Sequence, residues 1–150
     1  MGSVAKTRLL ADTSLSIVNR SGSTIPKNKL VGVGTATGSE VAVDELHSAG
    51  ASAVLGAISE DLESGATGTL WGPGSICAVE SDGSGTIAPG AEVIAVAGAS
   101  LAASGRVKTL PSGAGTYYVV GRCVNGTAVA ATAGALALIR LCEPRKIIVA

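Results

Sequence analysis

The side chains that could do chemistry in this chain are few and scattered. Its single histidine, His47, follows Asp44 and Glu45. A hydrolytic triad needs a histidine held by a carboxylate beside a nucleophile, but this polar stretch is typical of a solvated turn. The GxSxG turn that presents a nucleophilic serine is also absent from the sequence. We therefore predict no catalytic residue and no enzymatic activity.

Metal-ligating residues are not grouped in the sequence either. Cys77, Cys123 and Cys142 are widely spaced and form no CxxC motif, which excludes the common zinc and thioredoxin-like patterns. We interpret them as free, buried, small apolar residues within strands. Residues 60–63 (EDLE) lack the alternating acidic pattern of a calcium loop and are interpreted as a solvated turn. The sequence thus predicts no metal site.

A glycine-rich run at residues 32–38 (GVGTATG) superficially resembles a dinucleotide-binding loop. Its spacing differs from that motif, no long amphipathic helix follows it, and it lacks the lysine of a phosphate-binding loop. We interpret it as a turn that leaves a strand, and we predict no cofactor.

Composition limits the classes of partner. Eleven basic residues balance eleven acidic ones, and only 15% of the 150 residues are charged. A nucleic-acid-binding protein needs a basic stripe, so no nucleic-acid partner is expected. The longest uncharged run, between Arg122 and Arg140, is too short and too polar to span a membrane, so we expect a soluble protein without a membrane partner. A neutral, charge-poor surface favours self-association.

The elements that must position these residues are short and β-like. With 47% hydrophobic but only 2% aromatic residues, the core must be built from Val, Ile, Leu and Ala. Short apolar runs alternate with Gly, Ser and Pro, which is typical of a sandwich or barrel. Residues 81–85 (SDGSG) predict a hairpin turn, and residues 43–47 predict one short helix. Strands are predicted at residues 14–19, 29–34, 54–59, 75–80, 92–97, 117–124, 135–141 and 146–149.

An internal repeat accompanies these strands. Residues 24–33 resemble residues 86–96 at an offset of about 63, residues 54–56 resemble 119–121 at 65, and residues 68–71 resemble 134–137 at 66. We interpret the halves, about 24–74 and 86–141, as two similar β-modules. The alternative is chance similarity in a chain rich in Ala, Gly and Val. The predicted fold class is an all-β, compact, sandwich- or barrel-like domain over residues 14–150, with little helix.

Two sets of residues are candidates for contacts with partners. Residues 1–13 lack a clean period and predict an extended N-terminal arm. The arm combines charge with an apolar anchor and can add a strand to a sheet edge; its contact candidates are Val4, Lys6, Arg8, Leu9 and Leu10. The only large rings, Trp71, Tyr117 and Tyr118, are candidates for an interface between protomers, although packing in the core is the alternative.

Taken together, three stretches resemble the cement, or head decoration, proteins of tailed bacteriophages: VLGAISEDLESGATGTLW, IAPGAEVIAV and YYVVGRCVNGTAVAATAGALALIRL. The resemblance covers about residues 20–142. The chain departs from the family at Arg122-Cys123, where small residues are usual. The residues at matching places are Gly56, Ala57, Gly65, Gly68, Gly90, Gly121 and Leu141.

The resemblance implies a structural protein on the outer surface of an icosahedral capsid, bound where subunits of the major capsid protein meet. It also implies a homotrimer that adds contacts against internal DNA pressure and does no chemistry. The arm is expected to make the capsid contact. The alternative is a self-assembling fibre, spike or surface β-module that binds a host glycan.

Overall fold

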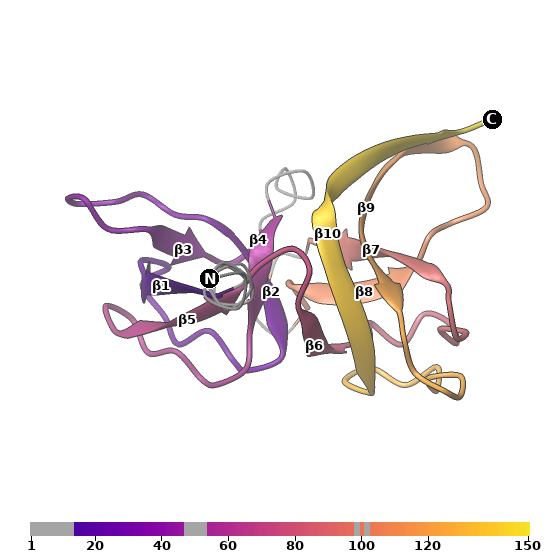
Figure 1. The fold of residues 1–150 in the computed structure, drawn as a ribbon, viewed down its shortest axis with the longest axis horizontal. Coiled ribbons are helices and arrows are strands. Elements are labelled where there is room, and N and C mark those ends of the chain that lie inside the picture. Colours follow the sequence, from indigo (N-terminus) through magenta and orange to yellow (C-terminus); the bar gives the residue numbers. More distant parts are fainter. Residues whose placement is uncertain (1–13, 47–53, 98–99, 101–102) are drawn as a thin grey trace, which may run out of the picture.

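The computed structural model describes residues 14–46, 54–97, 100 and 103–150. Among these residues the structure contains strands, turns and no helix, which confirms the predicted all-β class (Figure 1). The described residues accordingly include no helix that could cross a membrane. The strands are β1 (Ser14–Asn19), β2 (Lys29–Val33), β3 (Ala42–Asp44), β4 (Val54–Ile58), β5 (Thr67–Trp71), β6 (Ile76–Glu80), β7 (Glu92–Val96), β8 (Arg106–Thr109), β9 (Gly115–Cys123) and β10 (Leu136–Val149).

The strands form two modules. In the first, β1-β3-β2-β4-β5 close into a barrel, because β1 pairs with β5 on one side and, in parallel, with β3 on the other. In the second, the strand order is β6-β10-β9-β7-β8, and one parallel bridge, Ser81 to Val107, links its two ends. Figure 1 shows the two modules side by side along the longest axis.

The pairings show that the second module repeats the first strand for strand, so β6–β10 correspond to β1–β5. Val31 pairs with Gly56 as Val93 pairs with Gly121. The isolated bridges from Ile25 to Leu62 and from Ile87 to Val129 have the same place in each module. Even the irregularities agree, because a register shift follows both Val31 and Val93. The predicted pair of similar modules is therefore confirmed.

The offset between equivalent residues grows along the chain. It is 62 at Val31 and Val93, 65 at Gly56 and Gly121, and 69 where Leu70 corresponds to Ile139. The match of residues 68–71 to 134–137 is thus wrong by three residues, since Gly68 corresponds to Ala137. The extra residues all lie in connections between strands, where added length disturbs no ladder.

The junction between the modules explains why the first barrel is closed and the second is open. In the first module, the Val18 amide donates to the Val41 carbonyl and joins β1 to β3. In the second, the start of β2 lies between the equivalent strands: the Glu80 amide donates to Asn28 O at 3.0 Å, and the Leu30 amide donates to Gly105 O at 2.8 Å. The first module therefore fills the gap between β6 and β8, which we call the seam of the second module.

A buried ion pair accompanies this junction. The Lys29 side chain is only 3% exposed, and its Nζ lies 2.8 Å from Glu80 Oε2, which also accepts from Arg106 Nε at 3.0 Å. Burial lowers the pKa of Lys29, and its contact with Glu80 only partly offsets that effect. Partial burial pushes the pKa of Glu80 upward, but Lys29 and Arg106 together outweigh it and hold that pKa below its ordinary value.

The core consists of small aliphatic residues, as the composition predicted. One cluster, with Ile17, Val43 and Leu70, fills the barrel. A second fills the other module around Val79 and Ile139. Three buried residues of the first module, Leu30, Leu46 and Ala57, belong to that second cluster, so the modules share apolar packing as well as hydrogen bonds.

Two sequence-based expectations were wrong. Val43 and Asp44 belong to strand β3 instead of a helix, because they pair with β2 and the pairing removes their amides from water; residue 47 lies outside the described residues. Residues 81–85 turn the chain but do not make a hairpin, since β6 pairs with β10 and β7 pairs with β8 and β9. The Asp82 carboxylate accepts from the Ser84 amide, which stabilises the turn locally.

Candidate interaction surfaces

Several residues singled out in the sequence cannot be placed. The arm residues Val4, Lys6, Arg8, Leu9 and Leu10, and also His47, lie outside the described residues. Within the described ranges, no three His, Cys, Asp or Glu side chains are close enough to hold a metal ion. The acidic turn at residues 60–63 exposes its three carboxylates, and Asp61 Oδ1 accepts from the Lys27 amide at 2.9 Å.

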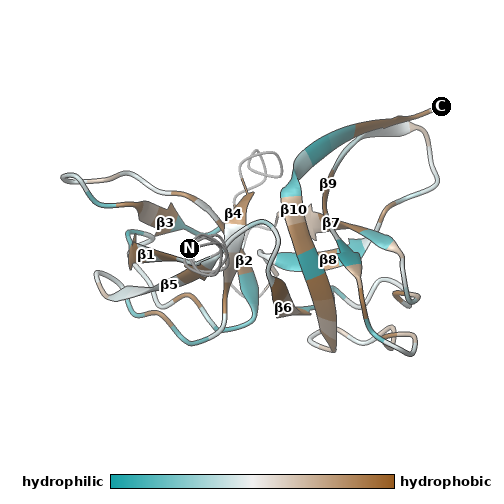
Figure 2. Cartoon of the chain, in the orientation of Figure 1, coloured by the Kyte–Doolittle hydropathy of each residue, from teal (hydrophilic) through white to brown (hydrophobic). Residues whose placement is uncertain are grey.

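An apolar face covers the outer side of β6 and of the first half of β10. Leu138 pairs with Ala78, and Arg140 pairs with Ile76, so alternate residues of both strands point to the same side. Ile76 is 53% exposed. Figure 2 shows the hydrophobic colouring of both strands. We define the apolar face by Ile76, Ala78, Val124, Leu136 and Leu138.

Trp71 borders the apolar face. It is half-buried at the end of β5, and its Nε1 donates to Ser59 Oγ at 3.3 Å. A shallow hollow of about 260 Å³ lies beside it, lined by Asn28, Ser59, Trp71, Ile76, Cys77 and Ala78. Trp71 also pairs with Ser14, the first described residue. The first described strand therefore begins beside this face.

The two tyrosines lie elsewhere, on a projecting β-ribbon. Residues Arg145 to Val149 of β10 pair with Gly115 to Val119 of β9, and Figure 1 shows this ribbon extending from the second module toward the C-terminus. Tyr117 Oη donates to Gly113 O at 3.0 Å. In the described chain the ladders with β6 and β7 end at Arg140 and Val119, so the outer edges of the ribbon have no strand partner there. The structure does not bring the tyrosines together with Trp71.

A basic hollow of about 370 Å³ lies on the second module at the base of the ribbon. Glu92 Oε1 is 3.0 Å from both Arg122 Nη2 and Arg145 Nη2, and Arg140 completes the charged lining. The guanidinium groups of Arg122 and Arg145 thus share one carboxylate, and with Arg140 in the lining the hollow carries net positive charge. Its full lining is Glu92, Val119, Gly121, Arg122, Arg140, Leu141, Cys142 and Arg145.

This hollow was not predicted from the sequence. Its charged residues come from β7, β9 and β10 and are up to 53 positions apart, so no motif joins them. One signal was present: Arg122 stands where the resemblance leads one to expect a small residue. The pairing explains that departure, because Arg122 corresponds to Ala57 of the first module.

The cysteines have three different environments. Cys123 is buried as predicted, Cys77 is half-buried, and Cys142 is exposed at the basic hollow, so the prediction of a buried thiol is wrong for Cys142. All three are free. Burial raises the pKa of the Cys77 thiol, which lowers its thiolate fraction at neutral pH.

We therefore expect an ordered reaction of the thiols. Alkylation of the native protein without reductant should modify Cys142 first and Cys123 last, because the reagent reaches only exposed sulfur. After denaturation, mass spectrometry should count three labels. A lasting count of one label would reveal an intrachain disulfide and contradict the prediction.

Comparison of the sequence with models of protein families, and with curated proteins, found no match.

Proposed function

We propose that this chain is a structural virion protein that binds the outside of a tailed-phage head and cements neighbouring subunits of the major capsid protein. The proposal rests on the resemblance described above and on one structural observation. The chain enters the fold at Ser14, beside Trp71 and the apolar face. An arm and an exposed apolar face that start from one point can engage the same partner.

The physical mechanism is selective binding to the assembled shell. A ligand that binds only the assembled lattice stabilises it by its binding free energy. Several contacts on one molecule act together through their effective concentration. Ordering a free arm costs about 1–2 kcal/mol per residue, so the arm contact needs main-chain hydrogen bonds and buried leucine. The proposed molecule is a homotrimer, does no chemistry, and uses neither metal nor cofactor.

Removal of the arm tests this function. A variant that starts at Thr13 keeps all ten strands, so its melting temperature should be nearly unchanged. It should lose most binding when it is co-sedimented with purified heads that lack the native protein. Undiminished binding would place the contact in the β-modules, and failure of the full-length chain to bind heads would contradict the function itself.

A surface variant tests the apolar face separately. Leu138→Ser should weaken head binding, because it removes an exposed apolar side chain from the centre of the apolar face. Ile148→Ser is the matched control, since Ile148 is 73% exposed on the ribbon, away from that face. Equal effects of the two substitutions would remove the apolar face from the proposal. Retention on a host glycan, or filaments of the isolated protein, would favour the fibre or spike alternative.

A further inference from the structure

The basic hollow occupies the same place on the second module that the junction occupies on the first. In the junction, Leu30 of β2 and Ala57 of β4 face the second module and join its core. Leu30 pairs with Ala57 as Glu92 pairs with Arg122. The face that the first module buries against the second therefore recurs on the second module, with charged residues in place of apolar ones.

A further pairing extends this equivalence to the rest of the hollow. Ala57 pairs with Trp71 as Arg122 pairs with Arg140. Nothing in the described chain covers this recurring face, which is open as the basic hollow. Terminal units of tandem repeats carry a polar outer face for solubility. Solubility alone does not account for a lining with three arginines and a single carboxylate, an excess of positive charge that calls for an acidic partner.

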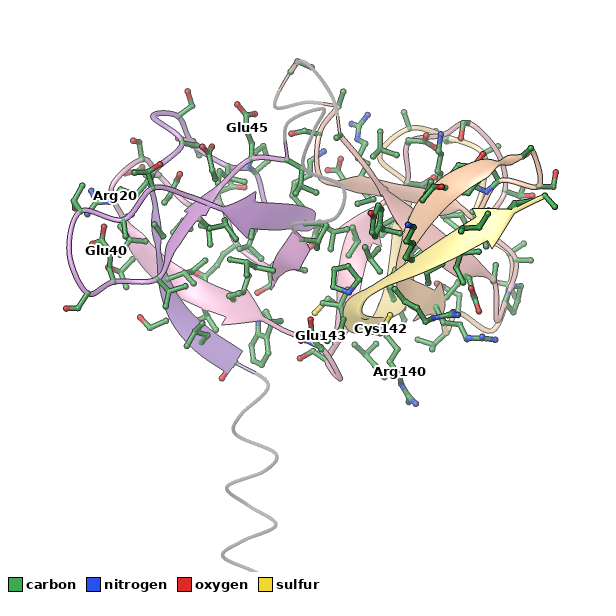
Figure 3. All side chains as sticks on the ribbon, turned by 90° about the horizontal axis from the view of Figure 1, so that it is seen from above. Arg20, Glu40, Glu45, Arg140, Cys142 and Glu143 are labelled. Carbon is green, nitrogen blue, oxygen red and sulfur yellow. The ribbon has the colours of Figure 1, made fainter. Side chains whose placement is uncertain are left out.

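The opposite end of the molecule supplies the complementary surface. Val43 pairs with β1 in the first module, and Val107 has the equivalent bridge to Ser81 in the second. Two residues earlier, Val41 therefore corresponds to Gly105. Gly105 is the residue that contacts Leu30 in the junction. Val41 is 37% exposed. Figure 3 shows Glu40 at one end of the molecule and Arg140 and Cys142 on the other module.

The first module is acidic and the second is basic, as a contact between their ends requires. Residues 14–72 contain six acidic and three basic residues, whereas residues 73–150 contain four acidic and six basic ones. Arg20 donates two hydrogen bonds to Glu40, both at 2.8 Å, and lowers the pKa of that carboxyl to about 2. Glu40 is therefore ionised near neutral pH, with Arg20 as its neighbouring counter-charge.

We propose that the basic hollow is the docking site for a second copy of this chain, which presents the end of its first module around Glu40 and Val41. The contact uses the faces that are equivalent to those of the internal junction, and it joins copies head to tail. A heterologous contact of this kind makes rings when its rotation closes and filaments when it does not. The inference deepens the proposed homotrimer by naming its surface, and it requires no capsid.

The internal junction also explains why this contact needs a hollow. At Gly105 an added Cβ would lie 2.4 Å from Leu30 O, so the internal contact tolerates no side chain. In the second copy, Val41 stands where Gly105 stands in the internal junction. The strands β1 and β3 of that copy are already joined by the hydrogen bond from the Val18 amide to the Val41 carbonyl, so no strand can enter between them. A larger element therefore docks from outside, and the recess of about 370 Å³ gives it room.

Disulfide trapping tests the contact directly. A Val41→Cys variant carries its new thiol at one end of the molecule and the exposed Cys142 at the other. Mild oxidation at high protein concentration should give linked dimers and trimers on non-reducing gels. Val41→Cys/Cys142→Ser should give none, and Ser84→Cys, an exposed control on another loop, should give no ladder beyond random collisions.

Charge reversal supplies an independent measurement. Arg140→Glu should weaken self-association in sedimentation velocity, whereas Lys108→Glu, the same change on β8 outside the hollow, should not. Absence of a Val41→Cys ladder would overturn the inference. If no ladder formed and Arg140→Glu lowered head binding, the hollow would be the binding site for an acidic segment of the shell. A ladder in a protein that binds no heads would leave this inference standing and contradict the proposed function.

Discussion

Replacing Gly56 by alanine is expected to destabilise the protein by at least about 1–3 kcal/mol, the usual cost of overpacking a closed core. A Cβ at this position would lie 2.3 Å from the carbonyl oxygen of Trp71. Backbone cannot rotate away as a flexible side chain can, so β4 and β5 would have to separate where Ala57 pairs with Trp71. Thermal unfolding should show a fall in melting temperature of several degrees.

The repeat makes the same prediction at Gly121. Its added Cβ would lie 2.6 Å from the Arg140 carbonyl oxygen, and Arg140 is the equivalent of Trp71. Gly126→Ala is the matched control, because nothing lies within 4 Å of a Cβ there. Stability equal to wild type in both Gly56→Ala and Gly121→Ala would contradict the close crossing of the strands in the two modules.

The second large effect is expected at the junction. Glu80→Gln removes the negative charge that lies 2.8 Å from the Lys29 ammonium, whose side chain is only 3% exposed. Breaking a buried ion pair from one side costs about 3–5 kcal/mol, and we expect a loss of about 3 kcal/mol because the Glu80 side chain keeps 22% of its surface in water. Lys29→Met should cost much less, since it removes the buried charge and leaves Glu80 with Arg106.

The dependence of unfolding free energy on pH distinguishes Glu80→Gln from the wild type. The pKa of Glu80 is lowered in the folded protein, so its contribution to stability is complete above the unfolded-state pKa of about 4.3. That contribution is lost as the pH falls through the lower, folded-state pKa. Chemical denaturation between about pH 6 and 2 should therefore show a smaller fall in Glu80→Gln than in wild type. Identical slopes would mean that Glu80 is not held by the two cations.

Local patterns were sufficient for most strands of this fold. The runs at residues 14–19, 29–34 and 54–59 became β1, β2 and β4 within one residue, because alternation and flanking turns define them. The strands β3, β5 and β8 are missing from the predicted ranges, since three to five residues carry little period and depend on partners distant in the sequence.

One long strand was predicted as two. Pro144 falls within β10, and proline cannot donate to a ladder, so the sequence favoured a break. The structure places it in a register shift between Leu141 and Arg145, where the ladder needs no donor. The strand therefore continues beyond its pairing with β6, keeps β9 as its partner, and becomes one side of the ribbon.

The candidate surfaces depended still more on tertiary structure. Trp71 was predicted as an interface residue from its type alone, whereas its neighbours on β6 are set by the arrangement of the two modules. The basic hollow needs Glu92, Arg122 and Arg145 to meet across three strands. Charge counts along the sequence cannot show that convergence.

The growing offset between the two modules has a consequence for engineering. The second module has longer connections than the first and keeps the equivalent pairings, which indicates that these connections accept inserted sequence. The connection after β9 is the most permissive by this measure, since the offset rises by four between Gly121 and Ile139. Asn125 should be kept, because its Oδ1 accepts from the Leu138 amide. A short peptide grafted between Gly126 and Thr127 would then be displayed on every copy of this protein.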